Sequence, residues 1–198
     1  AAGVARKKYV ETKFGGPERA KEIYARVAGV GNEVGIPFQF DKIERQPNTI
    51  NAHRLIAYAG VHGNQDAVSE ALFRAFFLEL RDIGDVAVLS DIAADTGLNR
   101  DAVYAYLSSD QGAAAAQQED AVARQLGITG VPFFVFGGKY AVSGAQNPDV
   151  LVQAYQQAAG ELATSYAVSG RACRSAKIIG SVPLKRRTSA FTIIPCCS

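Results

Sequence analysis

The chain has 198 residues, of which 48% are hydrophobic and 20% charged, and it contains 19 Gly and 7 Pro. This composition is typical of a folded globular protein and excludes collagen-like, fibrous and disordered chains. No run of 18 or more apolar residues occurs, so we expect no membrane-spanning helix and no membrane partner.

Charge and cysteine are distributed unevenly along the chain. All 3 Cys, namely Cys173, Cys196 and Cys197, fall in the last 26 residues, and Met is absent. From Ala163 onward there are six basic residues and no acidic one, which leaves 15 basic and 19 acidic residues before it. We therefore expect a boundary near Ala163, followed by a basic tail over residues 164–198 that is disordered or unrelated to the rest.

Three interpretations of this tail stay open: a lipid-modified anchor, a redox pair at Cys196 and Cys197, and an extension not selected for function. We favour the third, because helical periodicity and acidic residues both disappear there. The tail has no recognised nucleic-acid-binding fold and no interleaved aromatic residues, so we expect no nucleic-acid partner.

The first part of the chain predicts one helix and one extended segment. Apolar residues recur at helical spacing over residues 17–34, and Gly35 and Pro37 then favour a stop. Residues 38–43 alternate between apolar and polar, which predicts a short strand or an extended segment.

Residues 51–126 show an almost continuous helical pattern. The first predicted helix is capped by Asn51, runs to Ala59 and ends at Gly60. The others begin at Asp66, cover residues 86–95, follow Asn99 as a cap, and follow Asp110. The last of them is expected to end at Gly127 in a left-handed conformation, with Ile128 packed back on its final turn.

The pattern changes after Pro132. Residues 133–136 form a continuous apolar run, which predicts a strand buried on both faces. Gly137 and Gly138 predict a two-residue hairpin turn, and residues 139–143 alternate as the returning strand. A further helix is predicted from Pro148 to Gly160. This order of elements is that of the second half of a thioredoxin-type fold.

The segment over residues 130–146, which reads GVPFFVFGGKYAVSGAQ, resembles the DsbA family and specifically its FrnE-like branch. Shorter segments upstream agree: residues 13–19, 40–41, 47–49 and 52–55. The resemblance implies an α/β thioredoxin-like fold with an inserted helical domain, mostly helical here and lacking its first strand–helix unit. The expected segments are a partial thioredoxin-side segment with a linker helix (1–50), the helical insertion (51–128), the C-terminal thioredoxin half (129–163) and the tail.

The resemblance also implies a protein disulfide oxidoreductase that exchanges dithiols and disulfides with protein or peptide partners, without a cofactor. Its chemistry requires a Cys-x-x-Cys at a helix start, where the thiolate is stabilised. This chain has no such motif, so we expect that it is a fragment whose motif lies before Ala1, that it holds no catalytic residue, and that it is inactive as it stands. The branch resemblance and the scarcity of cysteine favour the cytoplasm, and a homodimer stays open.

The expected substrate-binding residues come from two places. Thioredoxin-like enzymes present the residue before a cis proline to the substrate backbone, which implies a role for Gly130, Val131 and Pro132 and a cis bond before Pro132. Asn48 and His53 are the other candidates, although His53 with its neighbour Arg54 is more simply explained as a hydrogen-bonded tie to the helical block. The two His are nine residues apart, so no metal site is expected.

Two other functions remain. One is a glutathione-dependent isomerase or transferase of the 2-hydroxychromene-2-carboxylate isomerase or kappa glutathione transferase type, with Ser at the helix start, glutathione as cofactor, and residues 48–54 on the small substrate. The other is a peptide-binding remnant without enzymatic activity. The aromatic residues Phe73, Phe76 and Phe77 could line a groove for unfolded peptide, but their helical spacing favours the core.

Overall fold

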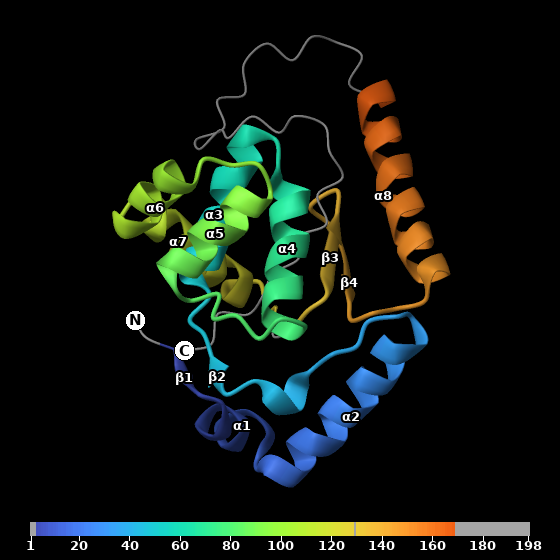
Figure 1. Ribbon diagram of the computed structural model, residues 1–198. Helices are drawn as coiled ribbons and strands as arrows, with labels where there is room; N and C mark the ends of the chain where they lie inside the picture. The colour runs from blue at the N-terminus through green and yellow to red at the C-terminus, as the bar shows by residue number, and fades with distance from the viewer. Residues whose placement is uncertain (1–2, 129, 169–198) are drawn as a thin grey trace. The chain divides into compact units, whose positions relative to one another are not determined.

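The computed structural model describes residues 3–128 and 130–168, and the chain divides into two compact units that meet in sequence at residues 121 and 122 (Figure 1). The structure is mostly helical, as the sequence predicts. The elements of the first unit are, in chain order, β1 (Val4–Ala5), α1 (Arg6–Phe14), α2 (Pro17–Glu33), a 3-10 helix (Phe40–Lys42), β2 (Arg45–Gln46), α3 (Ile50–His62), α4 (Gln65–Phe77), α5 (Val86–Asp95), α6 (Arg100–Ser108) and most of α7 (Ala113–Gln125).

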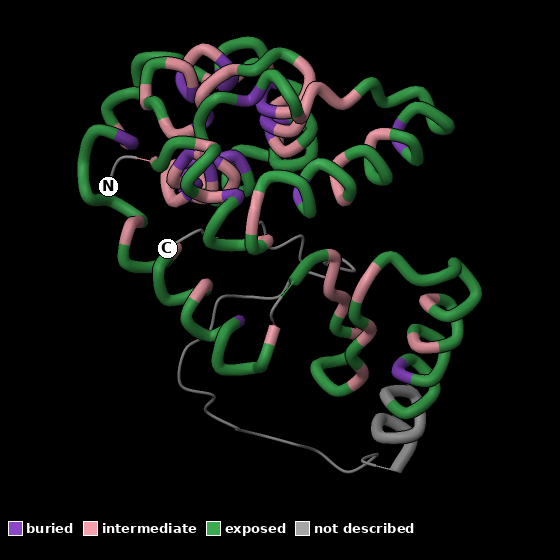
Figure 2. The backbone as a smooth tube through the Cα atoms, turned by 90° about the horizontal axis from the view of Figure 1, so that it is seen from below, coloured by how far each residue is buried: buried purple, intermediate pink, exposed green. Residues whose placement is uncertain are grey.

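The core of the first unit lies among α3, α4, α5 and α6. Its largest fully buried apolar side chains are Leu55, Leu72, Leu89, Ile92, Val68 and Val103. Figure 2 shows the buried positions gathered on these helices. Helix α4 supplies Val68, Leu72 and Phe76 to this core, which confirms the core position that helical spacing predicts for Phe76.

The expected strand over residues 38–43 is wrong. The chain forms a 3-10 helix there, and the rings of Phe38 and Phe40 stack on each other at 5.0 Å and both meet Phe77 edge to face. The backbone N–H of Gln39 donates to the carbonyl of Phe77, so the segment bonds to the end of α4 and not to a sheet. Aromatic packing thus overrides the alternating pattern.

The predicted ends of α3 are also wrong. The helix begins at Ile50 and continues through Gly60 to His62, with Gly63 in the left-handed conformation behind it. Asn51 therefore lies inside the helix, where its side chain accepts a hydrogen bond from Arg54. Helix α1 and the short pairing of β1 with β2 are further elements that the sequence did not reveal.

The second unit contains the end of α7, the strands β3 (Phe133–Phe136) and β4 (Tyr140–Ser143), and α8 (Pro148–Val168). The two strands pair antiparallel with Phe133 opposite Ser143, which confirms the hairpin. Its turn has three residues and not two, because Phe136 pairs with Tyr140 and the N–H of Lys139 donates to the carbonyl of Phe136. The predicted end of α7 is confirmed: Gly127 is left-handed, and Ile128 donates to the carbonyl of Ala123.

Two expectations for this unit are wrong. Strand β3 is not buried on both faces, because in the part of the chain that the structure describes it pairs with β4 alone, and Val135 is exposed. Helix α8 does not end at Gly160 but continues to Val168. Among the helices with described residues, none combines the length and the apolar character that crossing a bilayer requires.

Candidate functional site

The loop over residues 130–132 lies directly before β3. The peptide bond between Val131 and Pro132 is cis, as the family resemblance implies. Val131 is 40% exposed, and Gly130 is exposed as well. The three predicted residues of this loop therefore lie together at a surface of the second unit.

The backbone N–H and C=O of Val131 are available for hydrogen bonding to a ligand. Its neighbour Pro132 is held from one side, since its carbonyl accepts the N–H of Gly144 at 2.8 Å. Neither the N–H nor the C=O of Val131 hydrogen-bonds to any residue within 3–128 or 130–168. A free donor and acceptor on one exposed residue can pair with an extended peptide in the manner of a β-strand.

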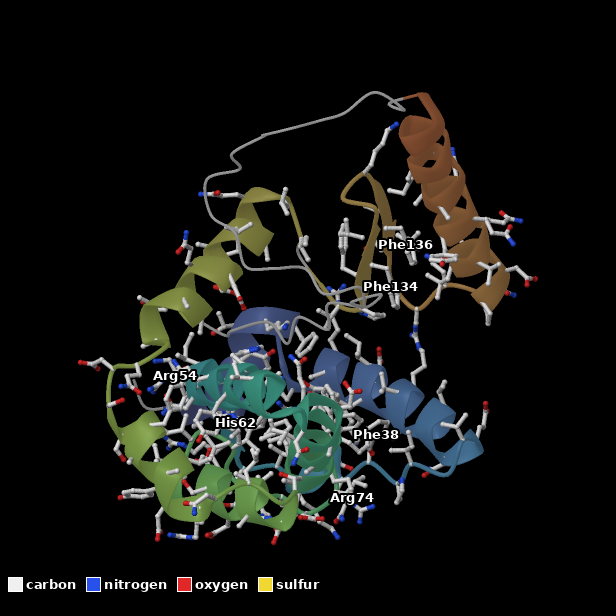
Figure 3. All side chains as sticks on the ribbon, turned by 90° about the horizontal axis from the view of Figure 1, so that it is seen from above. Phe38, Arg54, His62, Arg74, Phe134 and Phe136 are labelled. Carbon is white, nitrogen blue, oxygen red and sulfur yellow. The ribbon has the colours of Figure 1, made fainter. Side chains whose placement is uncertain are left out.

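The hairpin that follows this loop packs against α8. Phe134 and Phe136 lie on the same face of β3 with ring centroids 6.4 Å apart, and Figure 3 shows them on the side of the hairpin where α8 runs. The ring of Tyr155 on α8 meets Phe136 edge to face at 6.3 Å. Leu151 and Ala154 are half-buried and Ala158 is buried, so this face of α8 packs on the strands.

A polar cluster ties the hairpin turn to α8. The ammonium of Lys139 lies 2.6 Å from a carboxylate oxygen of Glu161, and the hydroxyl of Tyr140 donates to the other oxygen. These hydrogen bonds, that of Lys139 first, hold the pKa of Glu161 below its ordinary value. The same carboxylate raises the pKa of both Lys139 and Tyr140. No sequence pattern predicts this contact, because Lys139 and Glu161 are 22 residues apart.

The other two predicted residues, Asn48 and His53, belong to the first unit. The side chain of Asn48 accepts the N–H of Ile50 at 3.0 Å and so shapes the entrance to α3. The N–H of His53 donates to the carbonyl of Thr49, and its side chain is half-buried in the first turn of that helix. The structure thus gives both residues a place in the start of α3, in a different unit from Val131.

Arg54 beside them is the most constrained polar residue of this region. It is 3% exposed, and all five of its side-chain N–H groups donate hydrogen bonds of 2.7 to 3.0 Å. Four of the acceptors are main-chain carbonyls at the end of α6 and just beyond it, at Tyr106, Leu107, Ser109 and Gln111, and the fifth is the side chain of Asn51. The guanidinium caps the negative end of α6, which agrees with the simpler explanation of the His53–Arg54 pair as a structural tie.

The described parts of the chain hold no thiol, because the three cysteines lie among residues 169–198, outside them. Within those same parts, no group of three or more His, Cys, Asp or Glu side chains is placed to hold a metal ion.

Comparison with known proteins places this geometry in a family. The sequence profile of the DSBA-like thioredoxin domain matches residues 2–156. A probable DsbA oxidoreductase from Streptomyces coelicolor is similar in structure, with a TM-score of 0.70 and 30% identity over 80% of this chain and 68% of that one. A provisionally assigned protein disulfide isomerase from Nitrosomonas europaea shares the fold, with a TM-score of 0.53 and 19% identity over 76% of each chain. No curated protein matches by sequence. The fold is thus the thioredoxin-like fold of DsbA proteins, and the chain belongs to the family of DsbA-like thioredoxin domains.

Proposed function

We propose that this protein acts in thiol–disulfide exchange of the FrnE type, with protein or peptide thiols and disulfides as its substrates. The observation that carries the proposal is the backbone of the exposed residue Val131, whose N–H and C=O form no hydrogen bond with residues 3–128 or 130–168 and can hold an extended substrate segment as an added strand. Membership of the DsbA-like family supports the redox chemistry.

The chemistry itself needs two thiols. A thiolate attacks one sulfur of the substrate disulfide, a mixed disulfide forms, and the departing sulfur leaves as a thiolate that takes up a proton. A second thiolate then attacks the mixed disulfide and releases the reduced substrate. The printed sequence has no Cys-x-x-Cys, so we propose that a segment encoded upstream of Ala1 supplies the pair.

In this proposal, the loop with Val131 and Pro132 holds the substrate. An added strand on Val131 would bring a substrate disulfide to a fixed place beside Pro132, and positioning of this kind lowers the entropic part of the barrier. A reducing compartment such as the cytoplasm fits the proposal, because no cysteine precedes Cys173.

Insulin reduction by dithiothreitol tests the proposal. The 198-residue chain should not accelerate it, whereas the chain extended by its upstream coding segment should, and replacing the upstream cysteine pair with Ser should abolish the gain. Acceleration by a 198-residue variant in which Cys173, Cys196 and Cys197 are all Ser would contradict the mechanism. A Ser at the upstream helix start would favour the glutathione-dependent transferase instead.

A further inference from the structure

A groove of about 310 Å³ opens on the first unit, within the size range of ligand sites. It lies between the segment that leads into β2 and the connection from α4 to α5. Its lining residues include Ile43, Arg45, Phe76, Leu80, Arg81 and Asp82.

The floor of the groove is apolar. Ile43 and Phe76 are buried beneath it as members of the core, while Leu80 is 39% exposed and forms an apolar wall. A large apolar side chain entering the groove would cover Leu80 and rest on a floor that is already fixed by the core. Such burial is the main favourable contribution to binding at concave sites of this kind.

The backbone at Leu80 makes its side chain unusual. Leu80 has a φ of 59°, and it is the one residue other than Gly with positive φ among residues 3–128 and 130–168. The conformation belongs to the end of α4, where the N–H of Arg81 reaches back to the carbonyl of Ala75 at 2.8 Å. Glycine would satisfy this helix end with less strain. The chain therefore carries an apolar side chain at the groove against the local backbone preference.

The polar rim favours an uncharged hydrogen-bond acceptor. Arg81 has Glu79 and Asp95 at 3.8 Å each, which balances its charge but is too long for hydrogen bonds. Its side-chain N–H groups donate no hydrogen bond within the described parts of the chain. A peptide carbonyl would accept hydrogen bonds from these groups without adding charge. A carboxylate ligand would instead add a third negative charge beside Glu79 and Asp95.

The rim also carries both signs of charge. Lys42 and Glu44 are exposed on either side of the buried Ile43, and Arg45 is paired with Asp82 at 3.4 Å. Neither sign dominates, so the groove does not select a strongly charged ligand. We propose that it binds an extended segment of an unfolded polypeptide that places a large apolar side chain between Phe76 and Leu80. The inference rests on the proposed function. It gives the same class of substrate a second binding site, which is remote in sequence from Val131.

Fluorescence anisotropy with two short labelled peptides tests the groove without any thiol chemistry. Both peptides have a Gly-Ser background, one with a central Phe and the other with a central Ala. The Phe peptide should bind about tenfold more tightly, and Leu80→Gly should remove about that factor because the apolar wall is lost. Val61→Ala is the matched control: Val61 is an exposed apolar residue of the same unit outside the groove lining, and its variant should bind like the parent.

Hydrogen exchange on the peptide-bound 198-residue chain locates the contact. Added protection at residues 42–45 and 80–82 supports the groove. Unchanged affinity in Leu80→Gly, or protection confined to residues 130–136, overturns the groove proposal while leaving the proposed function intact.

Should Leu80→Gly alter the circular dichroism spectrum, Arg81→Gln replaces this variant and should weaken Phe-peptide binding about fivefold. Groove binding that persists in an extended chain with no insulin reductase activity would contradict the proposed function alone.

Discussion

The N–H of Gly144, the residue after β4, donates to the carbonyl of Pro132, the residue before β3, at 2.8 Å. This hydrogen bond closes the open end of the hairpin and holds the loop that carries Val131. Gly144 has a φ of 84°, a conformation that other residues adopt only at a cost.

Replacing Gly144 therefore tests how the loop is held. Gly144→Ala should lower the free energy of unfolding by about 1 to 2 kcal/mol, because alanine disfavours positive φ, and it should speed amide exchange at residue 144. Gly160→Ala is the control, since Gly160 lies inside α8 with open space around it and alanine is the better helix former. Equal effects of the two substitutions on stability would contradict this explanation.

The five hydrogen bonds of Arg54 predict a strong stability effect. Arg54→Ala leaves four main-chain carbonyls around the end of α6 without their donor, and we expect a loss of about 3 kcal/mol in urea denaturation. Arg54→Lys should recover only part of it, because an ammonium cannot reproduce the planar fork. Arg100→Ala removes an exposed arginine from its contact with Asp91 and should destabilise the fold far less, because water screens an exposed ion pair. A loss for Arg54→Ala no larger than that of this control would show that the hydrogen bonds contribute little.

Two glycines of α2 should respond in opposite directions. A Cβ at Gly31 would lie 2.5 Å from the ring of Phe38 and 2.7 Å from the carbonyl oxygen of Ile36, so Gly31→Ala should destabilise by about 1 to 3 kcal/mol. Gly29 has nothing within 4 Å of such an atom, and Gly29→Ala should stabilise the helix by about 0.5 to 1 kcal/mol. Thermal unfolding of the two variants measures both, and a stabilised Gly31→Ala variant would contradict the packing of Phe38 on α2.

The cluster around Glu161 predicts a pH dependence. Because its pKa is lowered in the folded chain, the carboxylate stabilises the fold above the ordinary pKa of Glu, and this contribution disappears as the pH falls through the lowered value. The melting temperature of the parent should therefore fall more steeply than that of Glu161→Gln below about pH 4.5. Parallel curves for the two proteins would show that Lys139 and Tyr140 do not stabilise the charged form.

The sequence predicted the elements whose signals are local. Periodicity located α2, α4 and α5, Asn99 marked the start of α6, and Gly127 marked the end of α7. The sequence-based predictions failed where contacts between residues distant in sequence determine the local structure. Phe38 stacks on Phe40 and meets Phe77 edge to face, and the segment forms a 3-10 helix in place of a strand. Helix α3 begins at Ile50, so Asn51 is not its cap, and its side chain accepts from Arg54.

The candidate site also has some features that the sequence predicted and others that it did not. The residues at 130–132 were recognisable because a proline before an apolar strand is a local pattern, and family resemblance gave it meaning. Two features depend on how β3, β4 and α8 pack, which no local pattern records. They are the lack of hydrogen bonds from the Val131 backbone to other described residues and the contact between Lys139 and Glu161. The strain at Leu80 was equally hidden, because nothing in the sequence marks position 80 as left-handed.

We propose that Val131 pairs with a substrate strand, and amide NMR of the 198-residue chain measures this pairing at the residue itself. A saturating amount of reduced insulin B chain should shift the Val131 amide signal and slow its exchange with solvent, as a new backbone hydrogen bond requires. If the B chain binds and the Val131 amide keeps both its shift and its exchange rate, the loop does not hold the substrate and the proposed role of this residue is contradicted.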